Sequence, residues 1–168
     1  MRLTEAFFRR DVLTVAPELV GKMICRRLPD GQVLRGMITE TEAYRGQEDL
    51  ACHARMGRTL RNAPMFGPGG FTYVYLIYGI HWLLNVVTGD ENDPQAVLIR
   101  ALEKPWDGPG KWTKAFRVTG ALNGICLADS RELWLEEGEK KEIITAPRVG
   151  IDYAGEPWKS IPWRFIGK

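Results

Sequence analysis

The chain has 168 residues, of which 45% are hydrophobic and 26% are charged, and its formal net charge is +2. This length predicts a single domain over residues 1–168 that buries a sizeable core, and the composition excludes disordered and collagen-like proteins. The small net charge identifies no partner by itself, so the positions of the charges have to be considered.

The cysteines and histidines argue against a metal centre. Cys25, Cys52 and Cys126 are widely spaced and form no Cys-x-x-Cys pair, and His53 and His81 are the only histidines. This pattern predicts reduced thiols rather than a zinc site, which is typical of a cytosolic protein. We therefore expect no cofactor.

Nothing in the sequence predicts a membrane or secreted protein. The apolar patch near the N-terminus is followed by charged residues and has no cleavage site of a signal peptide. The apolar run over residues 71–87 contains His81, Asn85 and Gly79, and its aromatic and β-branched residues favour strands over a membrane span. We expect a cytoplasmic protein, associated with the nucleoid if the source is bacterial.

The first predicted elements are a helix and a β-hairpin. A helix is expected over residues 14–20, with Thr14 as its N-cap and Gly21 as its stop. Residues 22–28 and 32–44 then flank the tripeptide Pro29-Asp30-Gly31, and Asp-Gly is a strong hairpin-turn signal.

A second hairpin is expected after a less regular region. Residues 50–60 predict a short helix or an irregular basic segment, and residues 61–70, rich in proline and glycine, predict a loop. Residues 71–78 and 82–87 are two apolar runs separated by a glycine, which predicts a hairpin with Tyr78 near its tip.

The remaining pattern adds strands and one helix. Residues 95–102 predict a strand that completes an antiparallel meander. A helix is expected over residues 111–119 after a Gly-Pro-Gly loop, and residues 133–144 are charged with some strand character. A final strand is expected over residues 161–166.

The stretch from 39 to 53 has an unusual polar pattern. Strict alternation along a strand places Ile38, Glu40, Glu42 and Tyr44 on one face. Two carboxylates and a tyrosine on one face are costly to bury without partners. They indicate either the wall of a site or an edge strand whose polar face is solvated.

Glu42 is the candidate general base, and Arg100 is its candidate partner. Arg100 is the only charged residue in the run 96–102, and a charge inside a strand of this kind needs a partner. A nearby carboxylate and partial burial raise the pKa of a glutamate, and a nearby arginine lowers it. A structural ion pair without chemistry explains the same pattern.

Tyrosines gather in the same part of the sequence, at Tyr44, Tyr73, Tyr75 and Tyr78. Aromatic faces stack on nucleobases, and an apolar side chain at a hairpin tip can open a base step from the minor groove. The alternative is that these tyrosines pack inward with their hydroxyls hydrogen-bonded.

The distribution of lysine and arginine bears on both chemistry and partner. No lysine occurs between Lys22 and Lys104, so this region offers no amine for a Schiff base and favours an activated water, while Cys52 is expected to be a buried thiol. A basic face is expected from the arginines Arg45, Arg55, Arg58 and Arg61, and a solvated acidic face from residues 129–142.

Several motifs occur together and in order along nearly the whole chain. They are Glu40-Thr41-Glu42-Ala43-Tyr44 followed by His53, Tyr73-Val74-Tyr75-Leu76-Ile77-Tyr78-Gly79, Val97-Leu98-Ile99-Arg100-Ala101-Leu102-Glu103, Gly108-Pro109-Gly110-Lys111 and Arg148-Val149-Gly150-Ile151-Asp152. Together they strongly resemble the alkyladenine (3-methyladenine) DNA glycosylase family. Each motif alone is weak, whereas their order and spacing are specific.

The resemblance implies a fold and an activity. The fold is α+β, a single mixed domain with a curved antiparallel sheet, a protruding β-hairpin and short surrounding helices, which docks on the DNA minor groove. The implied activity is monofunctional removal of alkylated or deaminated purines from damaged duplex DNA by a monomer. Glu42 would activate the attacking water, Arg100 would help to hold that water, and the backbone carbonyl of Val149 is a further implied contact.

The resemblance also assigns residues to the base. Tyr44, His53 and Tyr75 would form the walls of the pocket for the flipped base, with the two tyrosines on its faces. Tyr78 would replace the extruded nucleotide in the helix, and Asn85 would clash with the exocyclic amine of guanine. Such an enzyme must flip its target out of the duplex, and damaged bases cost least to extrude.

The sequence departs from the family pattern in two respects, and two alternative functions remain open. The chain begins close to the expected fold, so contacts by a long N-terminal extension are not expected, and the loop 65–70 has no basic residue for DNA phosphates. No clear general acid for neutral lesions is found. A damage-binding protein that does not cut would need no carboxylate at Glu42, and a hydrolase of free nucleosides would have little use for Tyr78.

Overall fold

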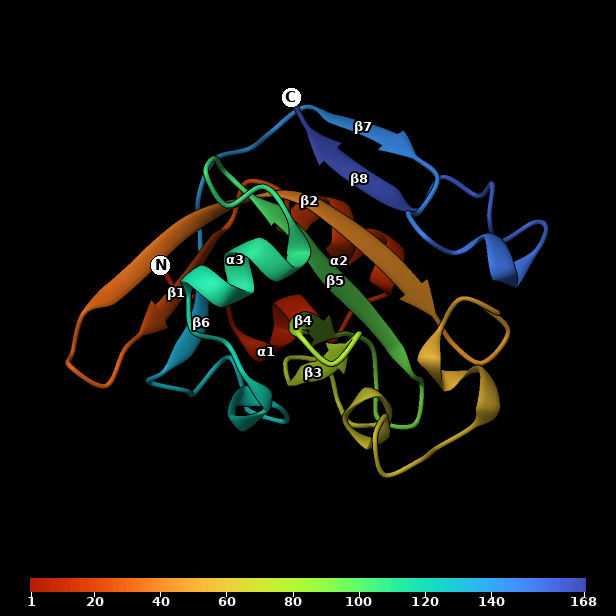
Figure 1. The fold of residues 1–168 in the computed structure, drawn as a ribbon, viewed down its shortest axis with the longest axis horizontal. Coiled ribbons are helices and arrows are strands. Elements are labelled where there is room, and N and C mark those ends of the chain that lie inside the picture. The colour runs from red at the N-terminus through yellow and green to blue at the C-terminus, as the bar shows by residue number, and fades with distance from the viewer.

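Strand β2 (Val33–Arg45) is the centre of the sheet in a computed structural model that describes residues 1–168 (Figure 1). The antiparallel strands follow the order β3-β4-β5-β2-β1-β6, with β8 pairing with both β2 and β7. β5 runs along one edge of β2, and β1 and then β8 pair along the other. The other strands are β1 (Met23–Arg27), β3 (Thr72–Ile77), β4 (His81–Val87), β5 (Gln95–Leu102), β6 (Leu133–Glu136), β7 (Ile143–Ala146) and β8 (Arg164–Gly167).

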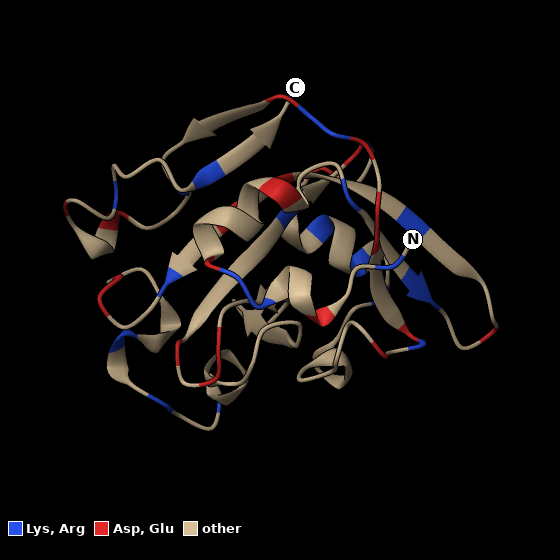
Figure 2. Ribbon diagram, turned by 180° about the vertical axis from the view of Figure 1, so that it is seen from behind, with Lys and Arg blue, Asp and Glu red and all other residues tan.

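Few helices accompany the sheet, and all are short. α3 (Pro109–Ala115) and α2 (Val12–Leu19) lie on opposite faces of it, as the two opposed views in Figures 1 and 2 show. α1 (Glu5–Phe8) precedes α2. The expected α+β fold with a curled antiparallel sheet is therefore confirmed. No helix combines the length and the apolar character that a membrane span requires.

The boundaries of two helices differ from those expected. α2 begins at Val12 because the Asp11 carboxylate accepts a 2.8 Å hydrogen bond from the Leu13 N–H, so Asp11, and not Thr14, is the N-cap. α3 begins at Pro109, where a proline needs no N–H partner, and ends at Ala115 rather than near residue 119. α1 was not expected, since a four-residue helix leaves almost no periodic signal.

Both predicted hairpins are present. Asp30 and Gly31 make the turn between β1 and β2, and Gly31 adopts a φ of +90°. Between β3 and β4, Tyr78 and Gly79 have φ angles of +53° and +68°, and the Ile80 N–H donates to the Ile77 carbonyl. Positive φ at both central residues is typical of the tight type I′ turn. This turn holds Tyr78 at the tip with 85% of its surface exposed.

A bulge in β2 breaks the alternation expected for it. The pairing of β2 with β5 shifts register between Ile38 and Glu40 and again before Thr41. The two shifts cancel, because Glu42 pairs with Leu98 in the same register in which Ile38 pairs with Leu102. That Ile38 shares the face of Glu42 stays a prediction.

The loops and the C-terminal part are more structured than expected. Short 3-10 turns interrupt the basic segment and the following loop, at His53–Met56 and Ala63–Phe66. The region 133–144 divides into β6, which pairs with β1, and β7, which pairs with β8. The last strand begins at Arg164 rather than at residue 161.

The core has a large main cluster, a small cluster beside it and a third cluster of three residues. The main cluster packs α2 and α3 onto the sheet, and Trp112 is fully buried with its indole N–H donating to the Ile99 carbonyl at 2.9 Å. Burying each large apolar side chain contributes about 1.5–3 kcal/mol. The small cluster contains Cys52, Met65 and Tyr73 and supports the loops that follow β2. It fixes those loops against β3.

Candidate active site

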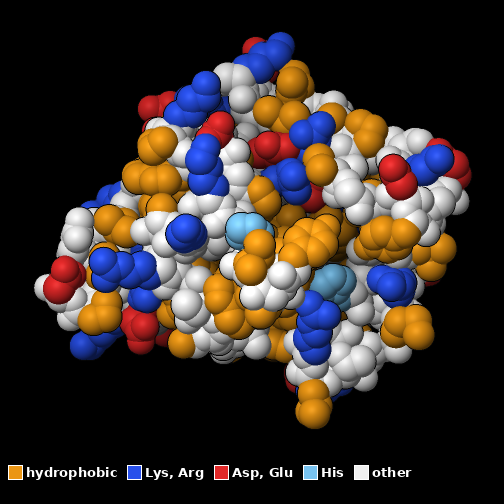
Figure 3. All heavy atoms as spheres, viewed as in Figure 1, with side chains coloured by type: hydrophobic (Ala, Val, Ile, Leu, Met, Phe, Trp, Pro, Cys, Tyr) orange, Lys and Arg blue, Asp and Glu red, His pale blue; other side chains and the backbone are white.

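A cavity of about 670 Å³ opens where β2, β3, β4 and β5 meet the start of α3 and the loops around residues 51, 61 and 150. All the residues singled out from the sequence line it: Glu42, Tyr44, His53, Tyr75, Tyr78, Asn85 and Arg100. In Figure 3 apolar and aromatic side chains fill the hollow between the two histidines, and Lys and Arg side chains surround it. The structure thus gathers side chains from distant parts of the chain.

Glu42 is fully buried, and its carboxylate has three polar partners. The Tyr44 hydroxyl donates to Oε1 at 2.9 Å, the Val149 N–H donates to Oε2 at 2.6 Å, and Arg100 Nη1 lies 3.6 Å from Oε1. Burial raises the pKa of Glu42 above its usual value, and Arg100, the Val149 N–H and the Tyr44 hydroxyl oppose that rise. The charge of the Glu42 carboxylate therefore depends on these neighbours.

Glu40 belongs to the same ionic network. Arg100 Nε lies 3.7 Å from its carboxylate, and Arg164 Nη1 donates to it at 2.7 Å. Two arginines thus face two glutamates across β5, β2 and β8, which offsets the cost of placing the acids together. Because β2 is paired on both edges and Glu42 is inaccessible, the solvated edge-strand interpretation is wrong.

Aromatic rings form the opposite wall. The rings of His53 and Tyr75 lie 4.5 Å apart, and His53 Nδ1 is 2.9 Å from the Tyr73 hydroxyl. Burial lowers the pKa of His53 to about 4, with Arg61 and Arg55 adding to the effect, so its ring is neutral near pH 7. Burial raises the pKa of Tyr73 to about 12.

One of the tyrosines packs inward and the others border the cavity or protrude, so both interpretations of the sequence apply. Tyr73 is 1% exposed with its hydroxyl against His53, as inward packing requires. Tyr44 and Tyr75 are partly buried and border the cavity, whereas Tyr78 protrudes. Asn85 is buried in the cavity wall, and its Nδ2 donates to the Tyr73 carbonyl at 3.1 Å.

The basic face is smaller than the sequence indicated. Arg55, Arg58 and Arg61 are exposed on the loop before β3, whose blue segments are visible in Figure 2, and Arg61 lies over the Tyr75 ring at 5.4 Å. Arg45, by contrast, pairs with Asp11 at 2.7 Å. None of the acidic residues of the segment 129–142 lines the cavity, in agreement with a separate acidic surface.

Sequence reasoning missed three contacts. Lys111 lies outside the lysine-free region yet reaches the cavity from α3, so the statement that the site offers no amine needs correction. Its Nζ is paired with Asp107 at 2.9 Å. Val149 donates its N–H to Glu42, and the further contact implied for its carbonyl stays a prediction. A buried Arg148–Asp49 pair, joined at 2.6 Å, lies behind Tyr44, and no local pattern could have connected residues so far apart.

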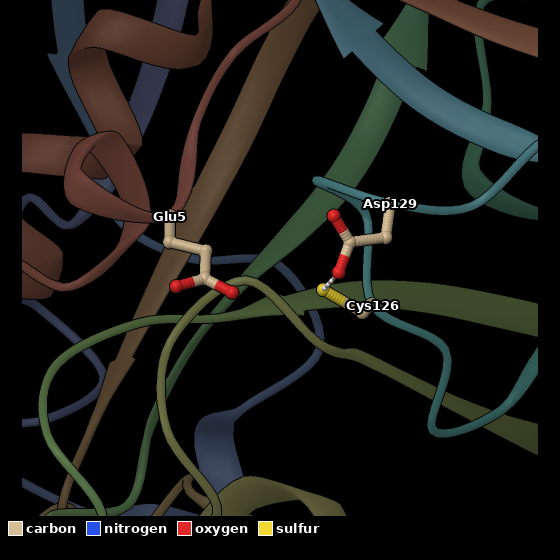
Figure 4. A group of neighbouring side chains, drawn as sticks. All are labelled: Glu5, Cys126 and Asp129. Carbon is tan, nitrogen blue, oxygen red and sulfur yellow. Dashed lines mark hydrogen bonds between the residues drawn. The ribbon is translucent and has the colours of Figure 1, made fainter.

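One other cluster has ligand-type side chains, but it lies outside the cavity. Glu5, Cys126 and Asp129 bring ligand atoms within 4.8 Å of one another, as Figure 4 shows. Each has a protein partner, because Glu5 pairs with Arg9 and the Cys126 thiol contacts Asp129 at 3.6 Å. Cys52 is buried as expected, and burial raises the pKa of its thiol to about 12.

Comparison with known proteins gives a consistent result. The model of the Methylpurine-DNA glycosylase (MPG) family matches residues 6–107 and 103–168. A relative from Methanocella arvoryzae, named "Putative 3-methyladenine DNA glycosylase", is 46% identical over 99% of this chain and 92% of its own length. Relatives with the same name from Desulfitobacterium hafniense and Chlamydia abortus are 43% and 42% identical over 98% of this chain, and over 94% and 97% of their own lengths.

Proposed function

Because this chain belongs to the methylpurine-DNA glycosylase family and is a DNA glycosylase for alkylated bases, we propose that it hydrolyses the N-glycosidic bond with a water activated by Glu42. The substrate is an alkylated or deaminated purine flipped out of damaged duplex DNA, and the product is an abasic site. The enzyme acts as a monomer without a cofactor, on DNA in the cytoplasm or nucleoid.

The observation that carries this proposal is a single buried carboxylate facing a cavity lined with tyrosines. Breaking the glycosidic bond develops positive charge on the sugar, which the Glu42 carboxylate stabilises while it takes a proton from water. The Arg100 nitrogens are 3.6 and 3.7 Å from the two glutamates, longer than a hydrogen bond, so their N–H groups have capacity to hold that water.

The cavity walls suit a purine. Tyr44 and Tyr75 offer ring faces for stacking, and a cationic alkylated purine gains a further cation–π contribution there. His53 is neutral and presents its free ring nitrogen without repelling a cationic base. Asn85 lines the cavity and would clash with the exocyclic amine of guanine, which disfavours the undamaged base.

The protruding hairpin and the arginines suit duplex DNA. Tyr78 at the hairpin tip is an apolar wedge of the kind that enters a base step from the minor groove. It would fill the space that the extruded nucleotide leaves. Arg55, Arg58 and Arg61 supply charge for phosphates, so DNA affinity falls as salt rises.

The test uses duplex DNA that carries a single 1,N6-ethenoadenine, followed by alkali to cleave abasic sites. Alkali-labile sites at the lesion support the proposal. Binding without such sites favours a damage-binding protein, and activity on free nucleoside alone favours a nucleoside hydrolase. A parallel assay with 3-methyladenine and hypoxanthine duplexes identifies the preferred lesion.

A further inference from the structure

Arg148 is a buried cation next to the candidate active site. Its side chain is completely inaccessible and follows the end of β7. The guanidinium lies between two aromatic rings, 4.9 Å from the centre of the Tyr44 ring and 5.1 Å from that of Trp163. A guanidinium is suited to this position because its planar faces stack while its edge donates hydrogen bonds.

Asp49 is the charged partner of Arg148. The two side chains form a bidentate pair, with Nη1 2.6 Å from Oδ2 and Nη2 3.0 Å from Oδ1. The same carboxylate accepts the backbone N–H groups of Arg45 and Ala51, both at 3.0 Å. Asp49 therefore shapes the turn that leads from β2 toward His53, and Arg148 fixes this turn to the C-terminal loop.

The two groups that donate hydrogen bonds to the Glu42 carboxylate both lie next to Arg148. The ring of Tyr44, whose hydroxyl donates to Oε1, is stacked on the guanidinium. Val149, whose N–H donates to Oε2, is the next residue in the chain. Arg148 Nη1 also donates to the carbonyl of Ala43, the residue between Glu42 and Tyr44, at 3.0 Å. One side chain thus aligns β2 with the loop that carries the Val149 donor.

We propose that Arg148 and Asp49 form a positioning pair that holds the Tyr44 hydroxyl and the Val149 N–H against the Glu42 carboxylate. The pair touches neither the base nor the water, and it acts through these donors. The inference rests on the proposed role of Glu42. A buried pair is costly to break, because removing one partner leaves the other charge unpaired. Lysine cannot replace Arg148, since a point charge does not form the bidentate contact.

The test compares Arg148→Lys and Asp49→Asn with the wild type in single-turnover base release across pH. The Glu42 carboxylate faces Arg100 on β5, Glu40 and Tyr44 on β2, and Tyr75 on β3. These groups are unchanged in both variants. Losing donors to the charged carboxylate raises the pKa of Glu42, so the acid limb of the profile moves to higher pH by about one unit. The rate on the acid limb falls by up to about tenfold, the most that a one-unit displacement produces, and lesion affinity falls much less.

Arg26→Lys is the matched control for a buried arginine. Arg26 is 8% exposed and donates to the carbonyls of Phe116 and Arg27, outside the cavity. If loss of stability alone slowed the enzyme, this variant would show the same kinetics at equal folded fraction. We expect it to keep the wild-type pH profile.

A backbone change covers the case in which the side-chain variants do not fold. Replacing the amide of Val149 by an ester removes only the N–H that donates to Glu42 and keeps every side chain. An upward shift of the acid limb supports the proposal. A wild-type profile in the ester variant, or in folded Arg148→Lys, overturns it. If Glu42→Gln released bases at the wild-type rate, the proposed function itself would fail, which is a different result.

Discussion

The hydroxyl of Tyr44 donates a 2.9 Å hydrogen bond to Oε1 of Glu42, two residues before it on β2. Because residues at this spacing share a strand face, the acid and the ring that borders the cavity are placed by the same backbone. Burial, and next the charge of Glu42, raises the pKa of Tyr44 well above its ordinary value, so the hydroxyl keeps its proton. Tyr44 therefore borders the cavity with its ring and keeps a hydroxyl that donates to the Glu42 carboxylate.

Tyr44→Phe keeps the ring and removes the donor. Without this hydrogen bond the charged carboxylate is less stable, so the pKa of Glu42 rises further above its usual value. On acidification the variant should therefore lose activity at a higher pH than the wild type does. The acid limb of its pH–rate profile should be displaced upward by about one pH unit. Tyr73→Phe is the control, since the Tyr73 hydroxyl contacts His53 instead of Glu42. The idea fails if both variants have the same profile.

Glu42→Gln should bind lesion duplex with near wild-type affinity and lose base release by several orders of magnitude. The amide has nearly the same shape but cannot accept a proton from water. Single-turnover assays and binding isotherms on ethenoadenine duplex measure the two effects separately. Glu48→Gln, at an exposed position, controls for the change in charge. A Glu42→Gln enzyme that cuts at the wild-type rate would remove this residue from the mechanism.

Tyr78→Ala should weaken binding to a lesion in duplex DNA more than binding to the same lesion in single-stranded DNA. Only the duplex leaves a gap in the base stack, and stacking on an aromatic ring contributes about 1–3 kcal/mol. Titrations of both DNA forms give the comparison. Tyr78→Phe keeps the wedge and should bind as the wild type does. Equal losses of affinity on both forms would argue against a wedge.

The ring of His53 should stay neutral well below its ordinary pKa of 6.5, with a midpoint near 4. Burial is the main cause, because it disfavours the charged ring. The unfolded chain takes up this proton near pH 6.5, so His53 contributes a loss of stability as the pH falls from about 6.5 to about 4. NMR of the ring measures the midpoint. A value near 6.5 would contradict the buried environment, whereas Arg61→Gln should raise the midpoint.

Lys111 should not form a covalent bond with DNA. Its ammonium is ion-paired with Asp107, and 63% of its side chain is exposed, whereas an amine nucleophile requires a desolvated setting. Borohydride added during base release should therefore trap no protein–DNA adduct. Lys111→Ala should release bases at the wild-type rate. An adduct that forms with the wild type and disappears in Lys111→Ala would identify a bifunctional enzyme.

Local chemistry allowed much of the fold to be predicted from the sequence. Asp30-Gly31 and Gly79 define tight turns, and turn residues act within four positions. The pairing of Arg100 with Glu42 was also predictable, because a charge inside a buried strand requires a partner. The bulge in β2 next to Glu40 was not predictable, since it depends on how β2 pairs with β5.

The tertiary contacts that support the candidate site were the least predictable from the sequence. Asp49 and Arg148 are 99 positions apart, and each residue alone is an ordinary surface type. Lys111 reaches the cavity only because α3 begins at Pro109 and packs against β4. Contacts of this kind depend on tertiary packing, which periodicity and propensity do not describe.

Glu42 lies in a strand that is hydrogen-bonded on both edges, whereas His53, Tyr78 and Val149 belong to loops or to a turn. Loops accept substitutions and insertions more readily than central strands do. Substitutions at exposed loop positions can therefore reshape the entrance of the cavity without disturbing the strand that holds Glu42.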